Sequence, residues 1–482
     1  MTERTVATGR VQAPSPPRRH RPQLALAIIL TCQLMLILDA TVMNVALPRI
    51  QAGLHFSTAG LSWVIDAYTL AFGGLLLLGG RVGDLVGRRR LFVVGIAVFT
   101  LASLVGGLST SATMLLAARV LQGVGGAMAG PSTIALIVTS FPEPRERIRA
   151  LALFSGMSSA GLAIGLVLGG VLTDALSWRW VLFINVPFGV AAALLALRYV
   201  RESERHPAAL DLPGAFTGTV GVAGLVYAFI RAAGSGWGDP AALVSLVGGV
   251  LVLGVFVLVE LRAEQPLLPL RLLADRNRAA AYLNFFLGPM AMLGMFFFLT
   301  QFMQEVYGLD PLVTGLAFMP MPVLLFTVTR LMSRLLARFG PRSIAVTGSA
   351  LMIAGLVWLT QLTETTSYAA GVLGPLMLFG LGAGLGFAPL NVIIMSSVPP
   401  RDAGAAGGVL QTAQQIGGAL GLAVLVTVFG VAARHATHPG VSAGHVLTSG
   451  MTAAFVASTV FACCSLLVAL TFRRQSDDLR RG

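Results

Sequence analysis

Three ionisable side chains, Asp39, Asp66 and Arg119, lie inside long apolar stretches of the sequence. Charged groups in such stretches are costly to bury and usually functional. Counted from the nearer ends of their stretches, they lie roughly 13, 9 and 10 Å deep at a rise of 1.5 Å per residue. We therefore expect them in one layer. A carboxyl group there could take up and release a proton, or bind a cationic substrate in exchange, because burial and a nearby guanidinium act on its pKa in opposite directions.

Other interpretations of these residues remain open. Asp39 and Arg119 could form a static ion pair that only fixes helix packing, and Asp66 is shallow enough to be hydrated from outside. We expect no metal site, because the histidines of the last external loop have no Cys or acidic companions. No nucleotide cofactor is expected either, since the glycine runs at 123–126 and 380–384 follow no strand and precede no Gly-Lys-Ser/Thr.

The composition identifies the elements that must position these groups. Of the 482 residues, 56% are hydrophobic and 11% are charged, whereas soluble domains carry roughly 25% charge. Many apolar runs approach 20 residues, the length that spans a bilayer as a helix. The sequence therefore predicts an all-α membrane protein and excludes soluble enzymes, disordered scaffolds and disulfide frameworks. The net charge of +13 comes from arginines scattered between apolar runs, which disfavours nucleic-acid binding.

Fourteen transmembrane spans are predicted. Arginine is concentrated in alternate connecting segments, as the positive-inside rule expects, so we place both termini in the cytoplasm. The predicted spans are 24–47, 60–80, 91–108, 112–138, 150–173, 180–199, 213–230, 241–261, 279–302, 312–336, 344–362, 370–396, 407–432 and 447–472.

The two halves of the chain echo each other. The loop after the second span aligns with the loop after the tenth at Gly87 and Gly340, and Pro131 aligns with Pro389. This predicts six-helix bundles at 24–199 and 279–472, a helix pair inserted at 213–261, and cytoplasmic tails at 1–23 (disordered) and 473–482. Parallel repeats of this kind are typical of transporters, whose substrate site lies between the halves near mid-membrane.

Several motifs together resemble a known family. They are Leu38 to Pro48 in span one; Gly80, Asp84, Gly87, Arg88 and Arg89 in the following cytoplasmic loop; Arg119, Gln122, Gly123, Gly125 and Ala127 in span four; Ser177 to Pro187; and Gln411 to Gly421. On these residues the sequence resembles the major facilitator superfamily, specifically its fourteen-helix drug/proton antiporter branch of the EmrB/QacA type.

The resemblance implies roles for individual residues. Asp39 would be the membrane-embedded carboxylate and Arg119 would take part in proton transfer. Asp66 stands where relatives have a small polar residue, so it could set selectivity. The remaining implied sets are a cytoplasmic latch that stabilises the outward-facing state (Asp84 with Arg88 and Arg89, in the motif that includes Gly80 and Gly87), a substrate cavity (Asn44, Tyr68 and Gln122), and an antiporter-like motif (Gly161, Gly165, Gly169 and Gly170, with Leu166 in place of the usual proline).

The function implied is secondary active transport and not catalysis. We expect proton-coupled efflux of amphipathic, cationic or aromatic compounds by alternating access across a bacterial inner membrane, driven by the proton gradient without a cofactor. The expected partners are a small-molecule substrate, protons and the lipid bilayer, with the protein a monomer. The alternatives are a dedicated exporter of one endogenous metabolite such as a self-made antibiotic, an uptake symporter, or a membrane protein that does not transport.

Overall fold

Helices account for all the regular secondary structure in the computed structural model over residues 22–141, 143–203, 210–268, 270–396, 398 and 403–472, which are the residues it describes. A helix satisfies its backbone hydrogen bonds internally, as a lipid environment requires. The predicted tail 1–23 lies outside the described residues except for Pro22 and Gln23, which begin the first helix. The predicted tail 473–482 lies outside them entirely.

Residues 22–199 form eight helical elements. Several run beyond the apolar stretches that predicted them, and the first continues through Pro48 to Leu54. The elements are α1 (Pro22–Leu54), α2 (Thr58–Leu61), α3 (Trp63–Val86), α4 (Arg88–Gly107), α5 (Ala112–Ser140), α6 (Pro144–Ala175), α7 (Trp180–Phe183) and α8 (Asn185–Tyr199).

The rest of the described chain contributes eleven elements, two of which are short π-helices, η2 and η3. They are α9 (Leu212–Ser235), α10 (Pro240–Arg262), η1 (Leu270–Leu273), α11 (Arg276–Gln301), η2 (Phe302–Val306), α12 (Pro311–Ala317), α13 (Pro320–Leu359), η3 (Ala369–Leu373), α14 (Gly374–Ser396), α15 (Ala403–Ala436) and α16 (Ala443–Leu470).

Within the described residues, twelve helical segments are long and apolar enough to cross a membrane. The predicted count of fourteen is not confirmed. One of the twelve, Pro311–Leu359, has 49 residues and contains a kink at Gly340, whose backbone is not helical (φ 73°, ψ 161°). In addition, α6 has 32 residues but is not among the twelve, because only Ala160–Ala175 of it counts as an apolar helix and this stretch is shorter than a span.

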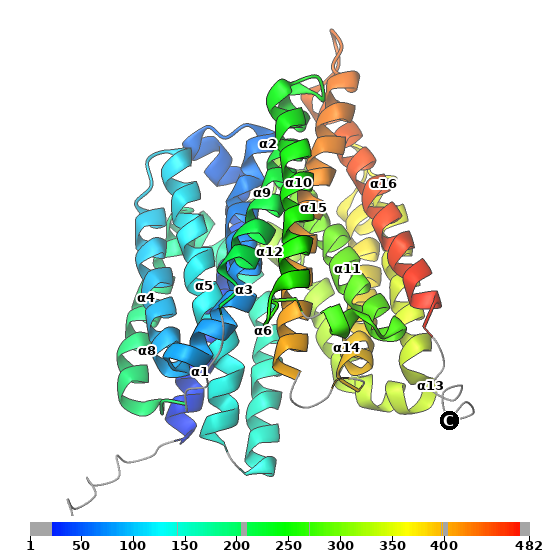
Figure 1. Ribbon diagram of the computed structural model, residues 1–482. Coiled ribbons are helices and arrows are strands. Elements are labelled where there is room, and N and C mark those ends of the chain that lie inside the picture. The colour runs from blue at the N-terminus through cyan, green and yellow to red at the C-terminus, as the bar shows by residue number, and fades with distance from the viewer. Residues whose placement is uncertain are drawn as a thin grey trace, which may run out of the picture.

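The helices gather into two groups in space. Figure 1 shows α1, α3, α4, α5, α6 and α8 on one side, α11, α13, α14 and α16 on the other, and α9 and α10 between them at the front. The inserted α9 contacts both groups: Tyr227 lies 6.3 Å from Trp63 between ring centroids, and Thr427 Oγ1 donates a hydrogen bond to Phe229 O at 2.5 Å. The predicted bundle boundaries stay a prediction.

Two glycines mark corresponding turns in the two groups. Gly87 separates α3 from α4, and Gly340 interrupts α13; both have positive φ, at 110° and 73°. Glycine adopts this left-handed region without a steric penalty. These are the positions that the sequence comparison of the halves aligned, so the echo between the two loops extends to their backbone geometry.

Helices from the two groups touch where small residues let them approach closely. We call the end of the molecule that holds Leu54 and the start of α12 the Leu54 face, and the end that holds Val86 and Arg88 the Arg88 face. Near the Leu54 face, a Cβ on Gly170 of α6 would come within 2.7 Å of Leu312 Cα. Gln304 Nε2 of η2 also donates to Val45 O of α1 at 2.9 Å. The two groups are therefore joined on this side.

Candidate functional site

A buried ion pair joins α1 to α5. Arg119 Nη1 donates to Asp39 Oδ2 at 2.5 Å, and the two residues are each about 1% exposed. Arg119 Nε also donates to Val64 O of α3 at 2.8 Å, and its Cζ lies 4.5 Å from the ring centroid of Tyr68. One guanidinium thus ties three helices together and rests on an aromatic face.

Amide and hydroxyl groups complete the shell around Asp39. Its second oxygen, Oδ1, accepts hydrogen bonds from Gln122 Nε2 at 2.9 Å and from Asn185 Nδ2 at 3.1 Å. Gln122 also accepts from Arg119 at 2.9 Å and donates to Ser103 Oγ at 2.8 Å. A buried carboxylate is tolerated only when it is paired and hydrogen-bonded, and both conditions are met here.

Asp66 lies apart from this network. It is fully buried on α3, and neither carboxyl oxygen has a hydrogen-bond partner among the described residues. The neighbouring Ser62 Oγ donates instead to Ala59 O at 3.0 Å. The three charges expected in one layer therefore divide into a connected pair, Asp39 with Arg119, and a separate carboxyl group.

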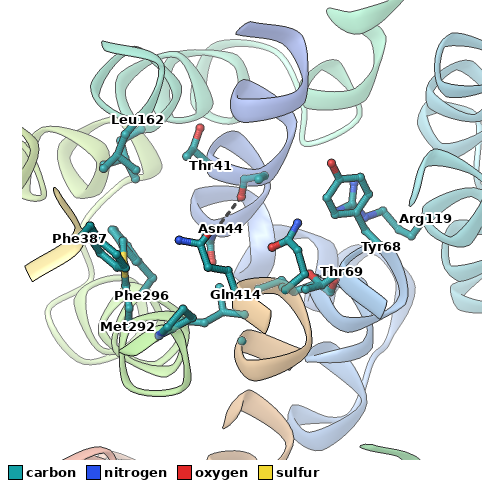
Figure 2. Close-up of a pocket in the computed structure, with 17 residues that line it drawn as sticks. Thr41, Asn44, Tyr68, Thr69, Arg119, Leu162, Met292, Phe296, Phe387 and Gln414 are labelled. Atoms are coloured by element: carbon teal, nitrogen blue, oxygen red, sulfur yellow. Dashed lines mark hydrogen bonds between the residues drawn. The ribbon is translucent and has the colours of Figure 1, made fainter. Parts of the chain in front are cut away.

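A cavity of about 360 Å³ lies between the two helix groups next to the ion pair. In Figure 2, Met292, Phe296 and Phe387 lie on one side of the cavity, and Tyr68 and Arg119 lie on the opposite side. Polar side chains, including Asn44 and Gln414, lie between them. The walls come from α1, α3, α5 and α6 of one group and from α11, α14 and α15 of the other. The lining residues are Ala40, Thr41, Asn44, Ile65, Tyr68, Thr69, Arg119, Leu162, Leu166, Pro289, Met292, Leu293, Phe296, Phe387, Gln414, Gln415 and Gly418.

Two of the three predicted cavity residues, Asn44 and Tyr68, line this cavity. Gln122 is fully buried in the Asp39 network instead, one layer behind the wall. Leu166, which stands where the family has proline, is 1% exposed and also lines the cavity.

The glycines of α6 provide close helix contacts. A Cβ on Gly161 would lie 2.8 Å from Ile37 Cγ2, and one on Gly169 would lie 2.9 Å from Val42 Cα. Gly165 lies against Thr41, between these two contacts. The three glycines therefore seat α6 directly on the stretch of α1 that carries Asp39, whereas Gly170 faces α12 of the other group.

The loop between α3 and α4 divides its predicted latch residues between two partners. Asp84 forms an ion pair with Arg88 at 2.7 Å, within the turn. Arg89 turns to Glu202 instead, donating its backbone N–H to Glu202 Oε1 at 2.9 Å, with its Nε 3.6 Å from Oε2. A carboxylate at the start of a helix is favourable because of the helix dipole.

The glycines of this loop differ in how closely they are packed. Gly87 lies against the carboxylate of Glu202: a Cβ there would come within 2.6 Å of Glu202 Oε1. Gly80 is less constrained, with Pro131 Cβ at 3.8 Å from its Cβ position.

Sequence reasoning missed several of these partners. Asn185 and Ser103 are small polar residues in predicted spans, and nothing in the sequence marks them as neighbours of Asp39. Glu202 is an acidic residue in an arginine-rich linker, which was a usable signal. Gln414 and Gln415 fall within the quoted motif of span thirteen, but no role was assigned to them.

Within the part of the chain that the structure describes, no cluster of three or more His, Cys, Asp or Glu gathers to hold a metal ion. The buried carboxyl group of Asp39 and the mixed polar and aromatic cavity beside it can take up a proton and bind a small molecule non-covalently.

Comparison with known proteins places this geometry in a family. The model of the Major Facilitator Superfamily matches residues 29–422. The chain is 44% identical to the puromycin resistance protein of Streptomyces alboniger, covering 88% of this chain and 84% of that protein. It is 42% identical to the cephamycin export protein of Amycolatopsis lactamdurans, covering 84% and 85%.

A solved structure shares the fold. A bacterial homologue of the human lysosomal transporter Spinster, in an inward-facing and occupied conformation, superposes with a TM-score of 0.65 over 95% of this chain and 97% of that one, at 18% identity. The members of this family are transporters and not enzymes, and a central cavity between two helix groups is consistent with transport. The chain belongs to the Major Facilitator Superfamily of membrane transporters.

Proposed function

We propose that this protein exports amphipathic small molecules, among them antibiotics, in exchange for protons. The observation that carries the proposal is the buried Asp39–Arg119 pair beside the central cavity. A proton site and a substrate site that share Arg119 can influence each other, as coupled exchange requires. The relatives named for puromycin resistance and cephamycin export support the direction and the class of cargo.

Asp39 would act as the coupling carboxyl group. In its charged form it accepts three hydrogen bonds and holds Arg119 in place. Protonation would weaken the attraction to Arg119 and free a guanidinium at the cavity wall. A network with two discrete arrangements of this kind can bias two conformations of the surrounding helices. Deprotonated Asp39 would prepare the cavity to accept cargo from the cytoplasm, and protonated Asp39 would favour its release outside.

Asp66 would be a second titrating group. A buried carboxylate without partners is strongly unfavourable, so we expect Asp66 to carry its proton in this conformation. Loss of that proton would require water or a donor to reach α3. We propose that this happens when the helix contacts at the Leu54 face separate.

We further propose fourteen spans with both termini in the cytoplasm, the Leu54 face outside and the Arg88 face inside. The kink at Gly340, which divides α13 into two arms, and the 32 residues of α6 supply the two spans beyond the twelve counted. The contacts of Gln304 and Gly170 across the halves would then close the external side, and the protein would work as a monomer in the cell membrane of a bacterium.

A dedicated exporter of one endogenous antibiotic is the second candidate. Each of the two relatives described carries the name of one antibiotic. The two candidates differ in the number of cargos, since a dedicated exporter would respond to one compound in a broad drug panel and a multidrug exporter to many.

Everted membrane vesicles test the proposal. Respiration acidifies the vesicle interior, and addition of puromycin or another exported drug to the outside should release protons, detected with a pH-sensitive fluorescent dye. We expect Asp39→Asn to abolish this release and Asp66→Asn to reduce it. Asp174→Asn is the matched control, because Asp174 is exposed near the end of α6 and should behave as the native protein.

Two results would count against the proposal. Drug addition that releases no protons in native vesicles, for any drug in the panel, would remove proton-coupled export altogether. Native-like proton release by Asp39→Asn would leave the transport function standing but would take the coupling role away from Asp39.

A further inference from the structure

The described wall of the central cavity carries amide groups and lacks the carboxylate that would bind a cation. Among its lining residues, Arg119 is the one that carries a charge, and no Asp or Glu is present. Asp39 lies behind the wall, with both oxygens engaged by Arg119, Gln122 and Asn185. A positively charged cargo would therefore find no free counter-charge in the described wall and would face a guanidinium.

Asn44 is the most constrained of the amides. It is 6% exposed, and its Nδ2 donates to Ala40 O at 2.8 Å. A carbonyl oxygen can only accept, so this bond fixes which end of the amide is nitrogen. Asn44 Oδ1 consequently points away from Ala40, and it is buried without a hydrogen-bond partner among the residues that the structure describes. An orphaned buried acceptor calls for an explanation.

A second buried asparagine shows what a purely structural amide looks like in this protein. Asn284 of α11 is 4% exposed and donates in the same way to the carbonyl four residues earlier, Ala280 O, at 3.0 Å. Its Oδ1, however, accepts a hydrogen bond from Ser465 Oγ at 2.5 Å. Asn284 does not line the cavity. The amide oxygen of Asn284, away from the cavity, therefore accepts a hydrogen bond, whereas the amide oxygen of Asn44, at the cavity wall, accepts none from the described residues.

Gln414 and Gln415 extend the polar surface from the other half. Both come from α15, line the cavity and are partly exposed. Asn44 belongs to the half that carries the ion pair. A cargo bonded to these three amides would bridge the halves. The aromatic side chains of Phe296 and Phe387 stand beside them for the apolar part of the cargo (Figure 2).

We propose that Asn44, Gln414 and Gln415 form the polar recognition site of the cargo and select aromatic molecules that carry an O–H or N–H donor and no fixed positive charge. This inference rests on the proposed export function. The donor of the cargo satisfies Asn44 Oδ1, the glutamine amides bond to its remaining polar groups, and its ring system contacts Phe296 and Phe387. Specificity of this type is strong because a cargo without the donor leaves a buried acceptor unpaired.

Three ligands with one shared ring system test the proposal. They are 9-anthracenemethanol, its methyl ether, and (anthracen-9-ylmethyl)trimethylammonium. Binding to the purified full-length protein in lipid nanodiscs is measured by fluorescence, with empty nanodiscs subtracted. The native protein should bind the alcohol about tenfold more tightly than the ether, as expected when a buried polar group loses its partner, and should bind the ammonium compound most weakly.

Variants assign this preference to the amides. Asn44→Leu should reduce the preference for the alcohol to less than about threefold, since the acceptor for its donor is removed. Gln414→Leu should weaken binding of the alcohol and of the ether to a similar degree, because the oxygen of both can accept from the amide. Asn44→Asp should improve binding of the ammonium compound. Asn284→Ala, the matched control, should lower thermal stability but leave the preference for the alcohol unchanged. Gln415→Leu, at a partly exposed position, provides a further variant if Asn44→Leu fails to fold.

Equal binding of the alcohol and the ether by the native protein would overturn the proposal, as would tightest binding of the ammonium compound. An unchanged preference in Asn44→Leu would also overturn it, showing that the donor of the alcohol does not bind to Asn44 Oδ1. Because binding at equilibrium needs no proton gradient, these outcomes are independent of vesicle transport. A protein that passes this test and releases no protons refutes only the export proposal.

Discussion

The two halves of the protein face each other across the cavity with different interiors. The N-terminal half buries a hydrogen-bonded network of Asp39, Arg119, Gln122, Asn185 and Ser103. The C-terminal half buries phenylalanines, with Phe298 stacked on Phe429 at 5.3 Å and edge-on to Phe297 at 5.1 Å.

This contrast shows where a proton can act. Hydrogen-bonded networks are directional, and a change in one member affects all the others. Aromatic packing tolerates small changes because it depends mainly on volume and area. At Met377, which aligns with Arg119, the C-terminal half has an apolar side chain that is 41% exposed. We therefore propose that charge-dependent switching belongs to the N-terminal half, whereas the C-terminal half supplies aromatic side chains and the amides of Gln414 and Gln415 to the cavity wall.

The largest effect should come from breaking the charged network. Arg119→Leu leaves Asp39 buried without its counter-charge, a change that costs about 3–5 kcal/mol of stability when a buried pair loses one partner. We expect a large drop in the midpoint of thermal unfolding and no proton-coupled transport.

The double variant Asp39→Asn with Arg119→Leu provides the control. It removes both charges, so stability should recover substantially while coupling stays absent. If Arg119→Leu alone unfolds at the same midpoint temperature as the native protein, the ion pair contributes little to stability. The contrast between the halves then loses its energetic basis.

The contact between the halves comes next in size. Gly170→Leu would force a side chain against Leu312 Cα, which lies 2.7 Å from the Cβ position. Overpacking of this kind costs about 1–3 kcal/mol. We expect the substitution to destabilise the conformation described here relative to one in which the Leu54 face is open. Spin labels on α6 and α12 should therefore show longer distances across the Leu54 face. Gly156→Leu is the matched control on the same helix, because its Cβ would meet no atom within 4 Å. Identical distance distributions in both variants would show that this contact does not hold the face closed.

Matched substitutions in the two interiors compare them directly. Phe298→Leu should cost about 1–1.5 kcal/mol, as conservative apolar changes do, with transport retained. Gln122→Leu, a similar change in volume within the N-terminal network, removes a donor to Asp39 and an acceptor for Arg119. We expect Gln122→Leu to lose proton-coupled transport in vesicles. Equal transport by the two variants would show that the halves are functionally alike.

The smallest effect concerns a single bond between the halves. Gln304→Ala removes the hydrogen bond to Val45 O, and one such bond contributes about 0.5–1.5 kcal/mol. We expect a several-fold shift toward conformations open at the Leu54 face, measured as faster labelling of a cysteine introduced at that face. A labelling rate at or below that of the native protein would contradict this role.

The sequence predicted the central pair but not its surroundings. Buried charges are few, so their depth alone brought Asp39 and Arg119 together. Depth does not report rotation about the helix axis, however. Asp66, at a similar depth on α3, forms no hydrogen bond or ion pair with Asp39 or Arg119 in the part of the chain that the structure describes. The family resemblance implied that Gln122 lines the cavity, whereas its side chain donates to Asp39. Asn185 and Ser103 were missed because short polar residues occur throughout membrane helices without a functional role.

The fold was predictable to a similar extent. Apolar runs identified the helices, but not their ends, since α1 continues through Pro48 to Leu54 and lipid-spanning helices tolerate proline. The count of spans depends on Gly340, where the chain turns without leaving helical structure for more than one residue. In the α3–α4 loop, the pairing of Asp84 with Arg88 was predicted. The contact of Arg89 with Glu202 was not, because Glu202 is far from Arg89 in sequence.

Proton release on cargo binding tests the central claim most directly. Purified protein is first brought to an acidic pH at which Asp39 carries a proton, in a weakly buffered solution with a pH indicator. It is then mixed with puromycin, and binding is followed in parallel. If Asp39 exchanges its proton as the site fills, the native protein releases protons on binding, whereas Asp39→Asn binds the drug and releases none. Proton release by Asp39→Asn equal to that of the native protein would contradict the account.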